Sequence, residues 1–120
     1  MGVPLPTGRQ FEMLAQFLNS EGVRLAGSIT PTYTTHDATT TSTEAVAANP
    51  DRRYLMIANN TDTPVYLMLG ADAVVNEGII LAVKGARYEM SPALGNLMLG
   101  GVNCIHGGAG TAKLLILEGE

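Results

Sequence analysis

Short apolar runs bounded by turn residues fill the chain from residue 49 to its end, and this pattern limits the fold more than any other feature. In the first run, Leu55 and Ile57 alternate with Tyr54, Met56 and Ala58. Strict alternation is typical of a half-buried strand, and closely spaced strands favour a sandwich or barrel. The further runs are residues 65–69, 78–83, 86–90, 97–107 and 112–118. We therefore predict an all-β fold, a small antiparallel β-sandwich of jelly-roll or immunoglobulin-like type.

Two details of these runs bear on how the strands pack. The runs 53–58 and 65–69 are joined by the polar stretch NNTDTP, which predicts a β-hairpin. The runs 78–83 and 114–117 are apolar on both faces. A strand buried on both faces implies either a packed second layer or a contact with another subunit.

The first 27 residues predict an arm. Phe11, Leu14, Ala15 and Leu18 follow helical spacing, and Thr7 precedes Gln10 by three positions, as in a capping box. We expect a helix over residues 8–20. Its apolar stripe can pack on the protein's own sheet, or it can dock on a partner, because so short a helix is marginal alone.

Residues 28–48 are rich in threonine, with eight threonines between Thr30 and Thr43. Threonine suits extended chain, but this stretch has little apolar material for a core. It predicts a linker that leads into an edge strand, although an arm laid along another protein would look the same. The expected domains are thus the arm 1–27, the linker or edge strand 28–48, and the β-sandwich 49–120.

No residue pattern predicts an enzyme, a cofactor or a small-molecule substrate. His36 and Asp37 are adjacent in an extended stretch and point to opposite sides, so we interpret them as a solvated polar pair rather than a catalytic one. Cys104 and His106 share a strand face, but a zinc site needs about four ligands. We expect no metal there and interpret them as a half-buried thiol beside a strand-end histidine.

Arg52 and Arg53 are the only adjacent cations. Guanidinium groups suit carboxylates across an interface, which makes the pair a candidate partner contact; the alternative is a solvated pair beside a strand. A net charge of −4 and an aromatic content of 5% argue against binding to nucleic acid. No run is long enough to span a membrane and no signal peptide begins the chain, so we expect assembly in a cytosol.

The stretches ANPDRRYLMIANNTDTPVYLMLG, GIILAVKGARYEM and GNLMLGGVNCIHGGAGTAKLLILEGE resemble small capsid decoration, or cement, proteins of tailed bacteriophages. The resemblance covers residues 44–120 and consists of patterns typical of β-scaffold rather than of a functional site. It implies a β-sandwich that forms a homotrimer on the outside of the capsid, assembled in the host cytoplasm. Similar domains serve in head fibres, necks and tails, so a domain that binds a host surface or a carbohydrate is the alternative.

The resemblance implies that the protein bridges major capsid subunits and so stabilises the shell. Its expected partners are the major capsid protein and copies of itself. The residues that we expect to contact the capsid are Phe11, Leu14, Ala15, Leu18, Arg52 and Arg53.

Overall fold

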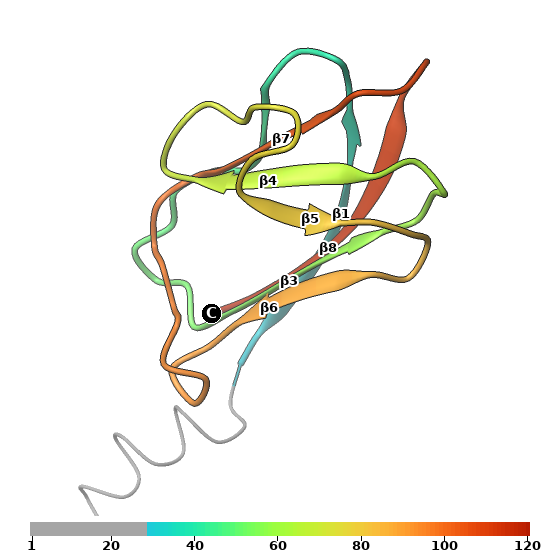
Figure 1. Ribbon diagram of the computed structural model, residues 1–120. Helices are drawn as coiled ribbons and strands as arrows, with labels where there is room; N and C mark the ends of the chain where they lie inside the picture. The colour runs from blue at the N-terminus through green and yellow to red at the C-terminus, as the bar shows by residue number, and fades with distance from the viewer. Residues whose placement is uncertain (1–28) are drawn as a thin grey trace, which may run out of the picture.

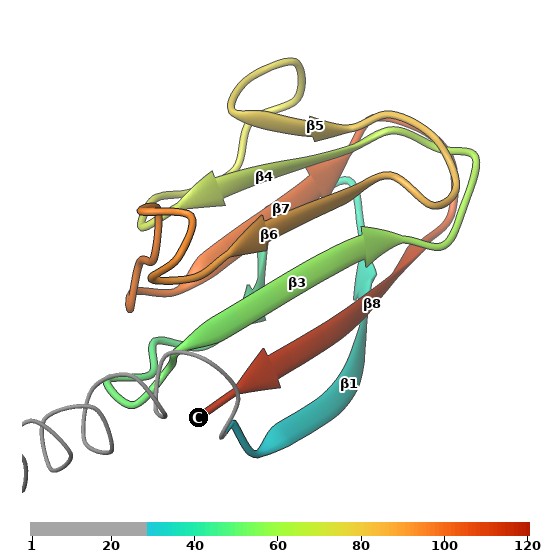
Figure 2. The ribbon, with the colours of Figure 1, turned by 90° about the horizontal axis from the view of Figure 1, so that it is seen from below.

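The computed structural model describes residues 29–120, which form two four-stranded antiparallel sheets (Figure 1). The strands are β1 (Pro31–Ala38), β2 (Thr43–Val46), β3 (Tyr54–Asn59), β4 (Val65–Leu69), β5 (Ile79–Leu81), β6 (Arg87–Met90), β7 (Val102–His106) and β8 (Ala112–Gly119). One sheet has the order β1-β8-β3-β6, seen side by side in Figure 2, and the other has the order β2-β7-β4-β5. The predicted all-β sandwich is confirmed.

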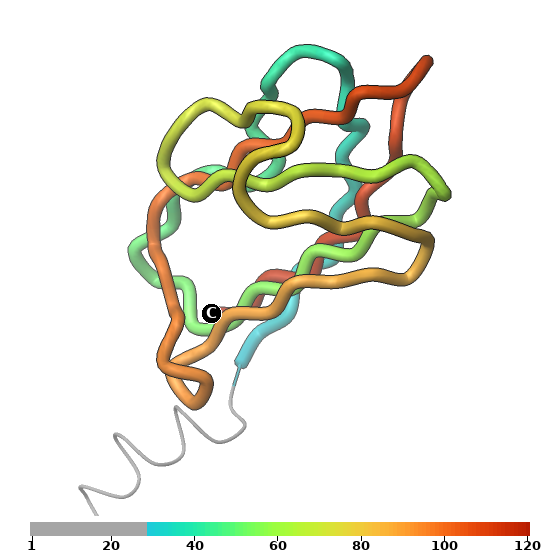
Figure 3. Tube along the Cα trace, viewed as in Figure 1, coloured from blue at the N-terminus to red at the C-terminus, as the bar shows by residue number. Residues whose placement is uncertain are grey.

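The path of the chain identifies the type of sandwich. Nearly every connection carries the chain from one sheet to the other, as the tube in Figure 3 shows, and within residues 29–120 β4 and β5 are the only consecutive strands that pair. Eight strands that alternate between two sheets in this order form a jelly roll. Of the two predicted sandwich types, the structure is therefore the jelly roll.

The core follows from strand alternation. Leu55, Ile57 and Asn59 of β3 are buried, while the residues between them are half-buried. The inner residues of β8 meet them from the neighbouring strand, because Ile57 pairs with Ile116 and Asn59 pairs with Leu114. The alternation predicted for residues 54–58 is thus confirmed. Among residues 29–120, the buried apolar residues of the core cluster run from Ala38 to Ile116.

The predicted hairpin between residues 53–58 and 65–69 is wrong. These residues form β3 and β4, which lie in different sheets and do not pair. Asn59 holds the corner between them: its buried side chain donates to the carbonyls of Thr63 and Leu81 and accepts from the amide and hydroxyl of Thr61. A turn held by a buried side chain can carry the chain across the sandwich instead of reversing it within one sheet.

The threonine-rich stretch belongs to the sandwich, so the expected boundary at residue 49 needs correction. Its residues form β1 and β2, which are edge strands in the two sheets. Of the two expectations for this stretch, the edge strand therefore describes it and the linker does not. All eight residues of β1 pair with β8, and Ala38 and Val46 enter the core. Main-chain pairing, together with a few inward-facing side chains, is enough to hold an otherwise polar strand in the sandwich. The predicted arm, residues 1–27, lies outside the described residues.

Candidate functional site

Arg52, which we predicted to contact a partner, is a buried structural residue. Its side chain is 1% exposed. The guanidinium donates to Glu118 Oε2 at 2.7 Å, to the carbonyls of Met98 and Gly100 at 2.7 and 2.9 Å, and to the carbonyl of Ala47 at 2.7 Å. These bonds connect the 97–101 segment to the end of β8, and β7 begins only at Val102. Arg52 is therefore not a surface contact.

Of the other residues predicted to contact a partner, only Arg53 lies in the described part of the chain. Arg53 is half-buried at the entry to β3, and its amide donates to the carbonyl of Gly119 at 2.8 Å. Phe11, Leu14, Ala15 and Leu18 lie outside the described residues.

The structure brings His36 close to Cys104, which sequence distance did not suggest. His36 Nε2 lies 2.9 Å from Thr43 Oγ1, and this hydroxyl lies 3.6 Å from Cys104 Sγ. A nucleophilic cysteine needs exposure and a depressed pKa. Here the thiol is fully buried, and burial raises its pKa, although the contact with Thr43 acts in the opposite direction. The arrangement is therefore that of a packing thiol.

His106 is fully buried and fixes the turn that leads into β8. Its Nδ1 accepts from the amide of Gly108 at 3.0 Å, so Nε2 carries the hydrogen and donates to the carbonyl of Gly110 at 2.8 Å. Both ring nitrogens are occupied by backbone groups. Within residues 29–120 no group of three or more histidine, cysteine, aspartate or glutamate residues is placed to hold a metal ion.

We expect Cys104→Ser to lower the free energy of unfolding by only about 1 kcal/mol, because the new hydroxyl can bond to Thr43 Oγ1 in the same place. Chemical denaturation measures the change. Cys104→Ser,Thr43→Val is the matched variant: it removes the bonding partner and should lose more. A loss above about 3 kcal/mol for the single substitution would contradict this account.

The outer faces of the two sheets differ in how they are covered. Over the β2-β7-β4-β5 sheet lies the loop of residues 70–78. The outward side chain of Asn103 donates to the carbonyl of Ala71, and the hydroxyl of Tyr66 donates to Asn76 Oδ1 at 2.9 Å. Outward-facing Ile105 is buried, whereas outward-facing Ile80 of β5 is 53% exposed. The chain's own loop thus covers part of this outer face.

The β1-β8-β3-β6 sheet carries an exposed apolar surface on its outer side. Tyr33 of β1 pairs with Leu117 of β8, which pairs with Met56 of β3, and Leu115 lies one row further along β8. Tyr33 is 75% exposed and Leu115 is 39% exposed. We call this surface the apolar outer face; it consists of Tyr33, Tyr54, Met56, Leu115 and Leu117.

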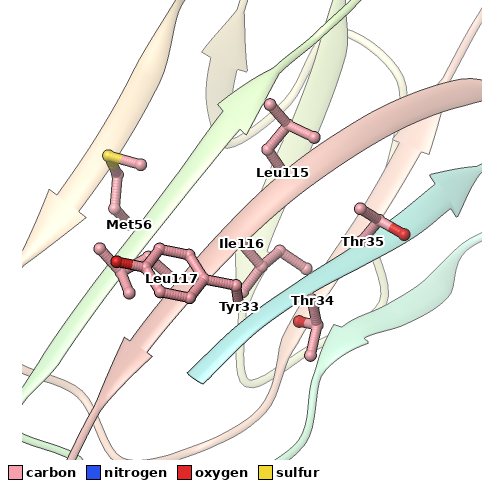
Figure 4. Close-up of a pocket in the computed structure, with 7 residues that line it drawn as sticks. All are labelled: Tyr33, Thr34, Thr35, Met56, Leu115, Ile116 and Leu117. Atoms are coloured by element: carbon pink, nitrogen blue, oxygen red, sulfur yellow. The ribbon is translucent and has the colours of Figure 1, made fainter. Parts of the chain in front are cut away.

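A shallow groove of about 530 Å³ runs along this face. Figure 4 shows the ring of Tyr33 extending from β1 across β8, with Met56 on the far side and Leu115 above it. Its lining is almost entirely carbon, since only tyrosine and threonine hydroxyls add polar atoms among the side chains. A large exposed tyrosine beside aliphatic side chains is typical of a docking surface.

Charged pairs border the apolar outer face on two sides. Lys113 Nζ lies 3.3 Å from Asp37 Oδ1 at one end, and Arg87 Nε lies 3.5 Å from Glu89 Oε1 along the β6 edge. Tyr54 donates to Glu89 Oε2 at 2.9 Å. Burial, and then this hydrogen bond and the nearby carboxylate, raise the pKa of Tyr54, which keeps its hydroxyl neutral. The face thus has an apolar centre and a polar border, as protein interfaces do.

Sequence reasoning found the strands of this face but not the surface. Residues 114–117 carried the sequence signal for this surface, because they are apolar on both sides. The sequence leaves open whether a second layer or another subunit covers such a strand. In the structure Leu114 and Ile116 enter the core, whereas Leu115 and Leu117 face outward. The second layer covers one side of β8, and on the other side Leu115 is exposed and Leu117 is half-buried.

Within residues 29–120 no helix could span a membrane. Comparisons with protein-family models, with curated proteins and with solved structures find no match to this chain.

Proposed function

We propose that this protein is a structural virion protein that binds the outside of a tailed-phage capsid and stabilises the shell by bridging major capsid subunits. The resemblance of residues 44–120 to capsid decoration proteins motivates the proposal. The observation that carries it is the apolar outer face, because a folded sandwich that leaves Tyr33 and Leu115 in water has a surface suited to another protein.

The size of the face limits how much it contributes alone. Four strands about 4.8 Å apart are about 19 Å wide, and the five paired rows from Leu115 to Gly119, about 3.4 Å apart, are about 17 Å long, which gives a surface of roughly 300 Å². A standard interface buries about 800 Å² on each partner. The proposal therefore includes the N-terminal segment, with Phe11, Leu14, Ala15 and Leu18, as a second contact. It also includes a homotrimer, whose linked contacts raise avidity through effective concentration.

We expect Leu115→Asp to weaken binding to undecorated capsids about tenfold, because an interface would bury an unpaired carboxylate. Ile80→Asp is the matched control: Ile80 is 53% exposed on the outer face of the other sheet. Co-sedimentation at increasing protein concentration, with thermal melting to show that both variants fold, gives the two affinities.

The proposal as a whole fails if the unaltered protein does not co-sediment with capsids. If it does bind, and Leu115→Asp and Ile80→Asp both bind like the unaltered protein, the apolar outer face is not the contact. Retention on host cells without retention on capsids would instead favour a host-surface domain of a fibre, neck or tail.

A further inference from the structure

The described chain begins on the apolar outer face. Thr30 and Glu120 exchange backbone hydrogen bonds of 2.8 and 3.2 Å, which extends the β1–β8 pairing by one residue. A Cβ built on Gly119 would point outward, since Gly119 pairs with Tyr54, and it would lie 2.8 Å from Ile29 Cδ1 and 3.3 Å from Tyr54 Cβ. The side chain of Ile29 therefore rests on the outer face beside Tyr54. Ile29, the first described residue, therefore lies at this face.

The dimensions of the face match the apolar stripe predicted in those residues. A helix over residues 8–20 would be about 20 Å long, and four strands with their side chains measure about 19 Å across. Residues 21–28, between that helix and Ile29, can span up to roughly 26 Å when extended. The stripe of Phe11, Leu14, Ala15 and Leu18 can therefore reach any part of the face.

A second copy of the chain fits the face less well. Two such faces packed together would bury roughly 600 Å² in total, which is in the range of crystal contacts and below that of stable dimers. A tethered segment needs less area, because a short flexible connection gives an effective concentration in the millimolar range. At micromolar protein, the stripe of the same chain is present at far higher local concentration than any surface of another copy.

We propose that in the free protein the stripe of Phe11, Leu14, Ala15 and Leu18 docks on the apolar outer face of its own chain. Ile29 is the fixed end of this contact, and Tyr33, Met56, Leu115 and Leu117 receive the stripe. The docked segment covers a sheet face on which residues 29–120 leave Tyr33 and Leu115 exposed. This inference concerns the free protein and does not depend on binding to a capsid.

Paired cysteines test the proposal in the full chain with Cys104→Ser. One protein carries Ala15→Cys and Thr35→Cys, and its matched control carries Ala15→Cys and Thr32→Cys. Thr35 and Thr32 are exposed residues of the same strand, but Thr35 pairs with Leu115 on the outer side and Thr32 pairs with Glu118 on the opposite side. Disulfide formation with oxidised glutathione is followed at micromolar protein by mass spectrometry and non-reducing gels.

Docking predicts that the Thr35→Cys protein closes an internal disulfide at least tenfold faster than the control. Leu115→Asp in the same protein should abolish this preference. An undocked segment would react at least as fast at position 32, which is nearer along the chain, and this order would overturn the proposal. Disulfide-linked dimers as the main product would also overturn it, because they would show that the stripe docks on a second copy.

Discussion

We expect Arg52→Met to lower the free energy of unfolding by about 3–5 kcal/mol, the usual cost of removing one partner of a buried ion pair. The substitution keeps an unbranched apolar stem and removes the guanidinium group. It leaves Glu118 without its guanidinium, and it leaves the carbonyls of Ala47, Met98 and Gly100 without a donor. Urea denaturation followed by circular dichroism measures the change, and at this size it would unfold a marginally stable domain at 37 °C.

Two further variants isolate the cause. Arg87→Met removes an exposed arginine from an exposed ion pair with Glu89, and we expect it to cost less than about 1 kcal/mol. Arg52→Met,Glu118→Leu should recover part of the loss, because it removes the carboxylate that the single substitution leaves unpaired. If Arg52→Met costs no more than Arg87→Met, the buried network does not support the fold.

Deleting residues 1–27 should weaken capsid binding roughly 100-fold, which corresponds to about 2.7 kcal/mol, and leave the sandwich folded. Folding is expected to survive because the core cluster of the described residues lies between residues 38 and 116 and the deletion retains Ile29. Binding is expected to fall because the proposed contact of the stripe with the shell is lost. The deletion also removes the docking of the stripe on its own sheet, which the shell must otherwise displace. The binding free energy lost with the first contact must therefore exceed the free energy gained by removing the second.

Thermal melting and co-sedimentation of the truncated protein measure the two effects. Phe11→Asp,Leu14→Asp in the full chain is the matched variant, since it disables the stripe and keeps the length. Unfolding of the truncated protein would show that the first 27 residues complete the core. Binding as tight as that of the full chain, or tighter, would show that the segment only covers the outer face and does not contact the shell.

The sequence predicts the strands of this fold better than their partners. Alternation in residues 54–58 identifies β3 and its inner face, because burial on one side requires a period of two. The same alternation cannot distinguish a hairpin from a crossing between sheets. Here the chain crosses, and the buried side-chain amide of Asn59 holds the corner at which it does so. Residues 31–38 lack apolar alternation, yet they pair fully with β8, because a ladder of main-chain bonds does not need apolar side chains.

The candidate site was only partly predictable for a similar reason. Apolar residues on both sides of β8 indicate two contacts, but the sequence does not say which contact is internal. Arg52 shows the limit most clearly, since a pair of arginines beside a strand suggests a surface. Its burial depends on carbonyls that come from residues 47, 98 and 100, and no local pattern places these around residue 52.

The bonds between Thr30 and Glu120 have a consequence for attaching cargo to this protein. They place the C-terminus beside the start of β1, next to the apolar outer face (Figure 1). A peptide or enzyme fused after Glu120 would therefore emerge at the surface proposed to meet the shell and would obstruct attachment. The turn at Lys84 and Gly85 lies at the opposite end of the sheet, about 25 Å away along β8. A Cβ at Gly85 would have no atom within 4 Å, although the φ of +91° favours glycine, so an antigen inserted beside Gly85 would be displayed outward.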